Sequence, residues 1–163
     1  MVLNKDLREF VGLLNEKGVK YLVIGGYAVA YHGYPRYTKD IDIWIWLNEE
    51  NAQKVIETIK AFGMASMHIL VDDLLNPDSV IQLGMPPNRI DILTDLETLD
   101  FETCYAQKEI ANLDGLDIAF LDFDNLIKSK LAAGRPQDKV DAKKLRDRKA
   151  KKKWRILMTY ITI

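Results

Sequence analysis

The sequence predicts an α/β (α+β) domain built on a mixed β-sheet, with helices packed on one face and a helical segment at its C-terminal end. Short runs rich in β-branched and aromatic residues recur at residues 21–24, 40–46, 80–83, 89–93 and 116–121. Segments with apolar residues at helical spacing occur at residues 3–14, 49–62 and 122–133. We expect the sheet to carry acidic residues on one face, with the helices of residues 122–153 closing one side of a cleft.

In the N-terminal half, each predicted element has a signal at one of its ends. Asn4 is suited to cap a first helix that ends near Gly18. A strand at residues 21–24 stops at Gly25 and Gly26, and residues 28–30 then suit a short helix. The strand at residues 40–46 precedes an amphipathic helix at 49–62, which Gly63 terminates.

The C-terminal half predicts a hairpin and two helices. Apolar residues between 64 and 71 suggest a short strand, and residues 80–83 and 89–93 form two strands joined by a five-residue connection. A helix near residues 99–106 and a strand at 116–121 follow. Asp122 is suited to cap a helix that ends at Gly134, and Pro136 occupies the favoured first position of another helix.

The length and composition are those of a single domain. A chain of 163 residues, 48% of them hydrophobic, can bury one core but is short for two. We expect one domain over residues 1–146 and a tail over residues 147–163. Cys104 is the only cysteine, which excludes an internal disulfide and suits the reducing cytoplasm. The sequence has neither a secretory signal nor a run apolar enough to span a bilayer, so no membrane insertion is expected.

Charge is distributed unevenly along the chain. Residues 1–142 carry a net charge of −9, whereas residues 143–155 contain nine basic residues against Asp147, a net of +8. The acidic body argues against broad binding of a phosphate backbone by the domain itself. The basic segment could bind RNA, an anionic partner or the body's own acidic surface, although a solvated charged helix is the plainer explanation. The apolar residues 154–163 could pack on the domain or pair with a second copy, which makes a homodimer plausible.

Two aspartates in one predicted strand are the strongest functional signal. Side chains alternate between the faces of a strand, so Asp40 and Asp42 share one face about 6.6 Å apart along it. Like charges so close together favour either protonation of one carboxyl or a bound cation. Asp91, between Ile90 and Ile92, is a later aspartate in an equally strand-like apolar setting and is the candidate for a third carboxylate. Carboxylates are suitable ligands for two Mg²⁺ ions in phosphoryl transfer.

Two glycines precede this strand. Gly25 and Gly26 lie between a predicted strand and a predicted helix, where backbone N–H groups could receive a phosphate. The spacing is neither that of a P-loop nor that of the dinucleotide-binding fingerprint. The combination of the glycine pair with the later aspartates is therefore more specific than either feature alone.

Together these motifs resemble the nucleotidyltransferase superfamily of the DNA polymerase β type. The similarity covers residues 20–146 and rests on GGYAVA at residues 25–30, RYTKDID at 36–42, IDI at 90–92 and LIKSKLAAGRPQD at 126–138. More narrowly, the chain resembles the small bacterial and archaeal branch that includes the abortive-infection nucleotidyltransferase toxins of toxin–antitoxin systems. The resemblance implies a nucleotidyltransferase-like fold and transfer of a nucleoside monophosphate from an NTP such as ATP, with release of pyrophosphate.

The resemblance also implies residue roles. Asp40 and Asp42 would bind both metal ions, Mg²⁺ or Mn²⁺, and Asp91 would bind one of them and help to deprotonate the acceptor. For the nucleotide phosphates it implies four residues: Gly25, Gly26, Arg36 and Lys130. The acceptor would be a hydroxyl or phosphate group on a small molecule, a protein or an RNA end.

Several of these residues have plainer structural roles. Two strand aspartates alone could be solvated acids at a sheet edge, and Trp44 and Trp46 are better explained by packing than by stacking on a base. Arg135 and Asp138 are spaced as a local ion pair at a helix start.

Two rival functions remain. The first is a non-catalytic nucleotide-binding or antitoxin-like protein that acts through a partner, and the second is RNA binding by the basic segment.

Overall fold

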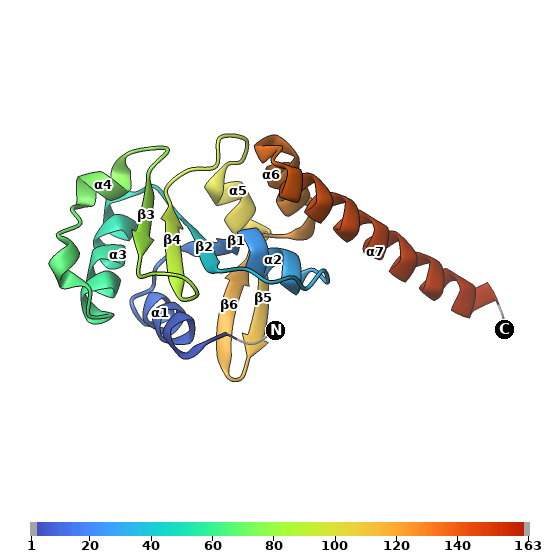
Figure 1. Ribbon diagram of the computed structural model, residues 1–163, viewed down its shortest axis with the longest axis horizontal. Coiled ribbons are helices and arrows are strands. Elements are labelled where there is room, and N and C mark those ends of the chain that lie inside the picture. Colours follow the sequence, from blue (N-terminus) through green and yellow to red (C-terminus); the bar gives the residue numbers. More distant parts are fainter. Residues whose placement is uncertain (1–2, 162–163) are drawn as a thin grey trace.

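The computed structural model describes the backbone of residues 3–161 and the side chains of residues 3–153 (Figure 1). Its first elements are α1 (Lys5–Glu16), β1 (Tyr21–Ile24), α2 (Gly25–Tyr31), β2 (Asp40–Ile45), α3 (Glu49–Ala61), the 3₁₀ turn η1 (Ala65–Met67) and α4 (Val71–Leu75). They are followed by β3 (Val80–Leu83), β4 (Arg89–Leu93), α5 (Phe101–Ala106), β5 (Glu109–Leu113), β6 (Leu116–Phe120), α6 (Phe123–Ala133) and α7 (Pro136–Ile161).

The strands form one mixed sheet in the order β3-β4-β2-β1-β6-β5. β2 is parallel to β4 and β1 to β6, whereas the remaining neighbouring pairs are antiparallel. The expected hairpin of β3 and β4 is confirmed, with Val80 opposite Leu93 and Leu83 opposite Ile90. Every residue of β1 is buried, as expected of a central strand covered on both faces. This arrangement confirms the predicted fold class.

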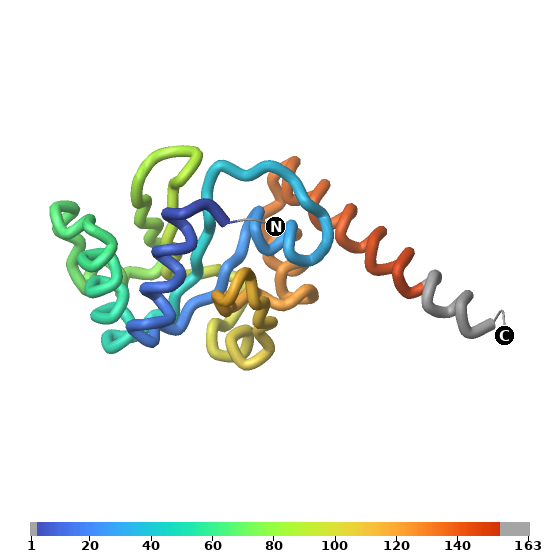
Figure 2. Tube along the Cα trace, turned by 90° about the horizontal axis from the view of Figure 1, so that it is seen from below, coloured from blue at the N-terminus to red at the C-terminus, as the bar shows by residue number. Residues whose placement is uncertain are grey.

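Helices lie on both sides of the sheet. α1 and α3 run side by side on one face (Figure 2), where the rings of Phe10 and Phe62 meet edge to face with centroids 5.1 Å apart. On the other side α6 and α7 pack against each other, and α2 contacts β1, β2 and α6. The second group covers the face that carries the aspartates of β2.

Several predicted helix ends are confirmed by their hydrogen bonds. The Asn4 side chain accepts from the backbone N–H of Leu7 at the start of α1. The Asp122 side chain likewise accepts from the N–H groups of Asp124 and Asn125 at the start of α6. α6 ends at Gly134, where the backbone is left-handed, and Pro136 then begins α7.

The prediction of a short strand between residues 64 and 71 is wrong. This segment forms η1 and the start of α4 instead. His68 has left-handed backbone geometry, which interrupts any extended run. Asp73 accepts a hydrogen bond of 2.8 Å from the N–H of Leu70 and so caps α4. Capping by a polar side chain outweighs the apolar composition that suggested a strand.

Strand β5 was not predicted from the sequence. It pairs with β6 through a tight turn at Asp114 and Gly115, which both have positive φ. Aspartate followed by glycine between two strands is a typical sequence of such two-residue hairpin turns, so the signal was present. The residues of β5 alternate between half-buried and exposed, which left little hydrophobic pattern to recognise.

α7 extends away from the sheet (Figure 1). Its residues up to 145 include Ala142 and Leu145, which are buried, whereas all eight Lys and Arg residues between 143 and 153 are exposed. The backbone continues past residue 146 in the same helix to Ile161. The side chains of residues 154–163, for which packing or pairing was expected, lie outside the described residues. Within the described part of the chain, no helix combines the length and hydropathy needed to cross a membrane.

Candidate active site

The pairing of β2 with β4 sets the geometry of the candidate site. The two parallel strands align Asp42 with Asp91 and Asp40 with Arg89. Residues paired across neighbouring strands project to the same face, so the three predicted carboxylates share one face of the sheet. Ile41, Ile43 and their partners on β4 fill the opposite face and are buried. The apolar face therefore fixes the register that brings the acids together.

The three aspartates line a cleft of about 560 Å³. Its walls come from the β1–α2 turn, the segment before β2, the two acidic strands, α6 and the start of α7. All the residues predicted for the site line this cleft: Gly25, Gly26, Arg36, Asp40, Asp42, Asp91 and Lys130.

Gly25 and Gly26 allow this turn to approach the acidic strand closely. Gly25 has a φ of 59°, and a Cβ built on it would lie 1.8 Å from Oδ2 of Asp42. A Cβ on Gly26 would lie 2.7 Å from Oγ1 of Thr38. Both positions therefore exclude a side chain for local reasons that do not depend on any ligand. Thr38 in turn donates a hydrogen bond of 3.0 Å to Oδ1 of Asp40.

Arg89 joins two of the carboxylates and was missed by sequence reasoning. Its Nε donates to Oδ1 of Asp91 at 2.8 Å, and its Nη2 donates to Oδ2 of Asp91 at 2.8 Å and to Oδ2 of Asp40 at 2.5 Å. The sequence did contain a signal, since Arg89 precedes Asp91 by two residues and must share its face of the strand. The guanidinium thus compensates part of the negative charge that the strand pairing concentrates here.

The pKa of Asp42 is raised in this cluster. Burial, followed by the negative charges of Asp40 and Asp91, raises its pKa from 3.8 to about 6. Lys130 and Arg135 act in the opposite direction but are outweighed. A carboxyl whose ionisation is disfavoured in this way gains from a nearby cation.

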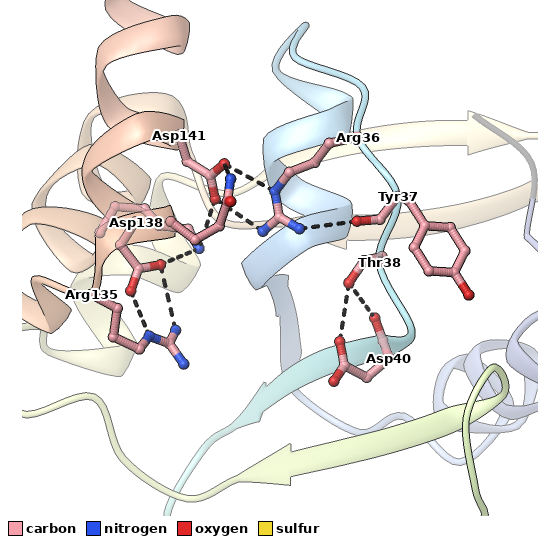
Figure 3. Close-up of polar contacts among 9 residues, drawn as sticks. Arg36, Tyr37, Thr38, Asp40, Arg135, Asp138 and Asp141 are labelled. Atoms are coloured by element: carbon pink, nitrogen blue, oxygen red, sulfur yellow. Dashed lines mark hydrogen bonds and ion pairs between the residues drawn. The ribbon is translucent and has the colours of Figure 1, made fainter.

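A second charged network forms the wall that faces the acidic strands (Figure 3). Arg36 pairs with both oxygens of Asp141, from Nε and Nη2, at 2.9 Å each. The buried Nζ of Lys130 lies 2.7 Å from Oδ1 of Asp138 and 3.3 Å from Oδ2 of Asp141. Arg36 and Lys130 therefore reach the cleft as predicted, but their charges are already paired with carboxylates of α7.

Arg135 is the most accessible cation of this network. Its Nε lies 2.6 Å from Oδ2 of Asp138, which confirms the predicted local pair, yet its side chain remains 74% exposed and lines the cleft. Burial would raise the pKa of Asp138, but the hydrogen bonds from Arg135 and Lys130 hold it below its usual value. Three cations thus share two carboxylates, which leaves this wall positive where it faces the acids.

The aromatic residues of β2 pack as expected. Trp44 is buried and meets the ring of Phe101 on α5 edge to face, with centroids 5.0 Å apart. Trp46 is half-buried, and the ammonium of Lys20 lies 4.2 Å from its ring centroid. Neither tryptophan lines the acidic cleft, so the prediction of packing over base stacking is confirmed.

The donor set suits a divalent cation. Asp40, Asp42 and Asp91 offer the hard oxygen ligands that Mg²⁺ and Mn²⁺ prefer. Burial and then the charges of Asp40 and Asp91 raise the pKa of Asp42, so a nearby cation would favour its ionised form. Across residues 3–153, no three acidic, His or Cys side chains are oriented to close around one ion as they stand. Arg89 lies against two of the three candidates. The three carboxylates therefore supply the ligand types that a divalent ion requires, with Arg89 bound to two of them as they stand.

Comparison with known proteins supports the fold. No known family profile matches the sequence. No curated protein matches it either. The structure is similar to a solved protein from Thermotoga maritima that is described as a candidate nucleotidyltransferase, with a TM-score of 0.57 and 19% sequence identity. The match covers 87% of this chain and 91% of the other, and it shows that the two share a fold.

Replacing Gly25 tests the close approach of the turn to Asp42. Gly18 has a similar φ of 66° with open space around it, so Gly18→Ala measures the backbone strain alone. We expect Gly18→Ala to lower the free energy of unfolding by about 1–2 kcal/mol. Gly25→Ala should lower it by about 1 kcal/mol more, because its new Cβ collides with the carboxylate. Urea denaturation of both variants measures this difference. Equal losses of unfolding free energy would show that a Cβ at residue 25 does not collide with Asp42.

The raised pKa of Asp42 predicts a pH-dependent stability in the absence of divalent ions. The folded pKa of about 6 exceeds the ordinary value of 3.8, so the folded state holds this proton more tightly. The stability that the proton contributes is complete below the ordinary pKa and is lost as the pH rises through 6. Asp42→Asn should therefore be more stable than wild type at about pH 8, by roughly 1–3 kcal/mol at 1.36 kcal/mol per pKa unit.

Denaturation in the presence of a chelator, at about pH 5 and about pH 8, measures this effect. The exposed Asp72 provides the control, because Asp72→Asn should have the same free energy of unfolding as wild type at both pH values. A difference between Asp42→Asn and wild type that does not grow with pH would show that Asp42 titrates normally.

Proposed function

We propose that the protein is a Mg²⁺-dependent nucleotidyltransferase that transfers a nucleoside monophosphate from an NTP to a hydroxyl or phosphate acceptor and releases pyrophosphate. The observation that carries this proposal is the convergence of Asp40, Asp42 and Asp91 in one cleft, opposite a wall of basic residues. A fold shared with a candidate nucleotidyltransferase is consistent with it. The sequence similarity to the abortive-infection branch, with ATP as a possible substrate and a cytoplasmic location, forms the finer part of the proposal.

Each part of the cleft then has a chemical task. Asp40, Asp42 and Asp91 would hold the metal ions, which would supply charge neutralisation of the triphosphate and activation of the acceptor. Asp91, which pairs with Asp42 across β2 and β4, would help to take the proton of the acceptor hydroxyl once Arg89 no longer occupies its oxygens. The Gly25–Gly26 turn bounds the cleft closely and can present backbone to the phosphates. Arg135 is the accessible cation that can pair with phosphate oxygens, whereas Arg36 and Lys130 position the wall.

The charge distribution favours this function over a non-catalytic role. A module that only binds a partner has no need for three carboxylates on one sheet face, because their mutual repulsion disfavours the folded state. Burial, the larger cause, and the neighbouring carboxylates together raise the pKa of Asp42, which adds to this cost. A reaction that uses the three carboxylates best explains their presence on one face.

Labelled nucleotides test the proposal directly. The protein is incubated with each labelled NTP, Mg²⁺ and separate pools of RNA, protein and small-molecule acceptors, and incorporation into each pool is measured. We expect label in one pool, reduced about 100-fold or more by Asp42→Asn or Asp91→Asn because each removes a metal ligand. Asp72→Asn, an exposed aspartate outside the cleft, is the matched control and should retain activity.

The outcomes separate the two principal functions. Incorporation that depends on Asp42 supports the enzyme. Nucleotide binding without incorporation in any pool supports the non-catalytic alternative. The absence of both nucleotide binding and incorporation would contradict both functions.

The surface of α7 supports RNA as the acceptor or as a second ligand. Between residues 143 and 153, α7 exposes eight basic side chains against the single acid Asp147. The helix begins at the cleft, where Gln137 and Asp138 line the wall, so the basic surface leads away from the reaction site. Clustered exposed cations of this kind attract a phosphate backbone.

Charge reversal tests this surface without truncating the chain. We expect Lys151→Glu, Lys152→Glu and Lys153→Glu, combined, to weaken RNA binding about tenfold or more and to flatten its dependence on salt, because fewer counterions are released. The control reverses charges elsewhere with Lys5→Glu and Lys60→Glu, two exposed residues of α1 and α3. Equal RNA affinity of the α7 variant and wild type across the salt series would rule out this role for α7.

A further inference from the structure

Arg89 makes more bonds to the acidic cluster than any other side chain near it. It occupies both oxygens of Asp91 and one oxygen of Asp40, at 2.5–2.8 Å. The other oxygen of Asp40 accepts from Thr38 at 3.0 Å. All four carboxylate oxygens of these two aspartates are thus engaged by donors of the protein itself.

A guanidinium and a divalent ion compete for these oxygens. Arg89 directs N–H donors at three of the four oxygens, which leaves each of the three one lone pair fewer for an ion that must approach within about 2.1 Å. Two cations within a few ångströms of each other also repel. Departure of Arg89 therefore favours metal binding by both Asp40 and Asp91.

The structure permits this departure. The Arg89 side chain is 26% exposed and lines the cleft, so it can rotate toward solvent without disturbing the core. Its backbone is held by β-sheet pairing with Asp40, so only the side chain needs to move.

We propose that Arg89 is a built-in counter-cation that stabilises the acidic cluster and competes with divalent metal for Asp40 and Asp91. The inference rests on the proposed function, because that function is what calls for a metal at this place. Arg89 therefore raises the stability of the metal-free protein but lowers the affinity of the protein for metal. It is a positioning residue, since it acts through the carboxylates.

Direct binding of Mn²⁺, without nucleotide or acceptor, tests the competition. We compare wild type with Arg89→Met, which keeps the length and packing of the side chain but removes its charge and donors. Arg89→Met should bind Mn²⁺ about tenfold more tightly or better. Lys60→Met removes one positive charge from an exposed position on α3 and should bind Mn²⁺ as wild type does.

Thermal unfolding gives an independent readout with the opposite sign. Without metal, Arg89→Met should unfold at a lower temperature than wild type because the carboxylates lose their counter-cation. Saturating Mn²⁺ should raise its unfolding temperature by more than that of wild type. If Arg89→Met does not fold without metal, Arg89→Lys serves instead, because its single ammonium cannot bridge the carboxylates as a guanidinium does, and it should bind Mn²⁺ more tightly than wild type.

The results distinguish this inference from the function on which it rests. Equal Mn²⁺ affinity of wild type and the Arg89 variants overturns the competition and leaves the metal site intact. Absence of Mn²⁺ binding by all of them overturns the metal site and, with it, both proposals.

Discussion

The parallel pairing of β2 with β4 is the constraint on which the rest of the candidate site depends. Buried isoleucines on one face of these strands fix the register, and that register aligns Asp42 with Asp91 and Asp40 with Arg89 on the other face. The hydrophobic core thereby forces negative charges together that would separate in solution. Burial, and next the charges of Asp40 and Asp91, raise the pKa of Asp42 in this setting.

Compensating cations explain how the fold accommodates the cluster. Arg89 neutralises part of the charge within the sheet, and the network of Arg36, Lys130 and Arg135 opposes it from the wall. Asp138 and Asp141 of α7 hold that wall in place, because they tie α7 to α6 and to the segment that enters β2. The same ion pairs that stabilise the structure therefore shape a cleft with an acidic floor and a basic side.

The sequence predicted the elements that carry strong local patterns and missed those that depend on contacts between distant segments. Alternation in β2 and β4 placed Asp40, Asp42 and Asp91 on one face, and capping residues defined α1 and α6. β5 has little hydrophobic alternation and is stabilised by pairing with β6. The pairing of Arg36 with Asp141 joins residues far apart in the chain, so no local pattern could reveal that this cation is already neutralised.

We propose that Asp40, Asp42 and Asp91 bind divalent metal together with a nucleotide. A crystal structure with Mn²⁺ and a non-hydrolysable NTP analogue, phased on the anomalous signal of manganese, tests it most directly. We expect manganese within about 2.1 Å of oxygens of Asp40, Asp42 and Asp91, with the guanidinium of Arg89 turned away and the phosphates between the ions and the basic wall. Manganese bound elsewhere, with Arg89 still bridging Asp40 and Asp91, would contradict it.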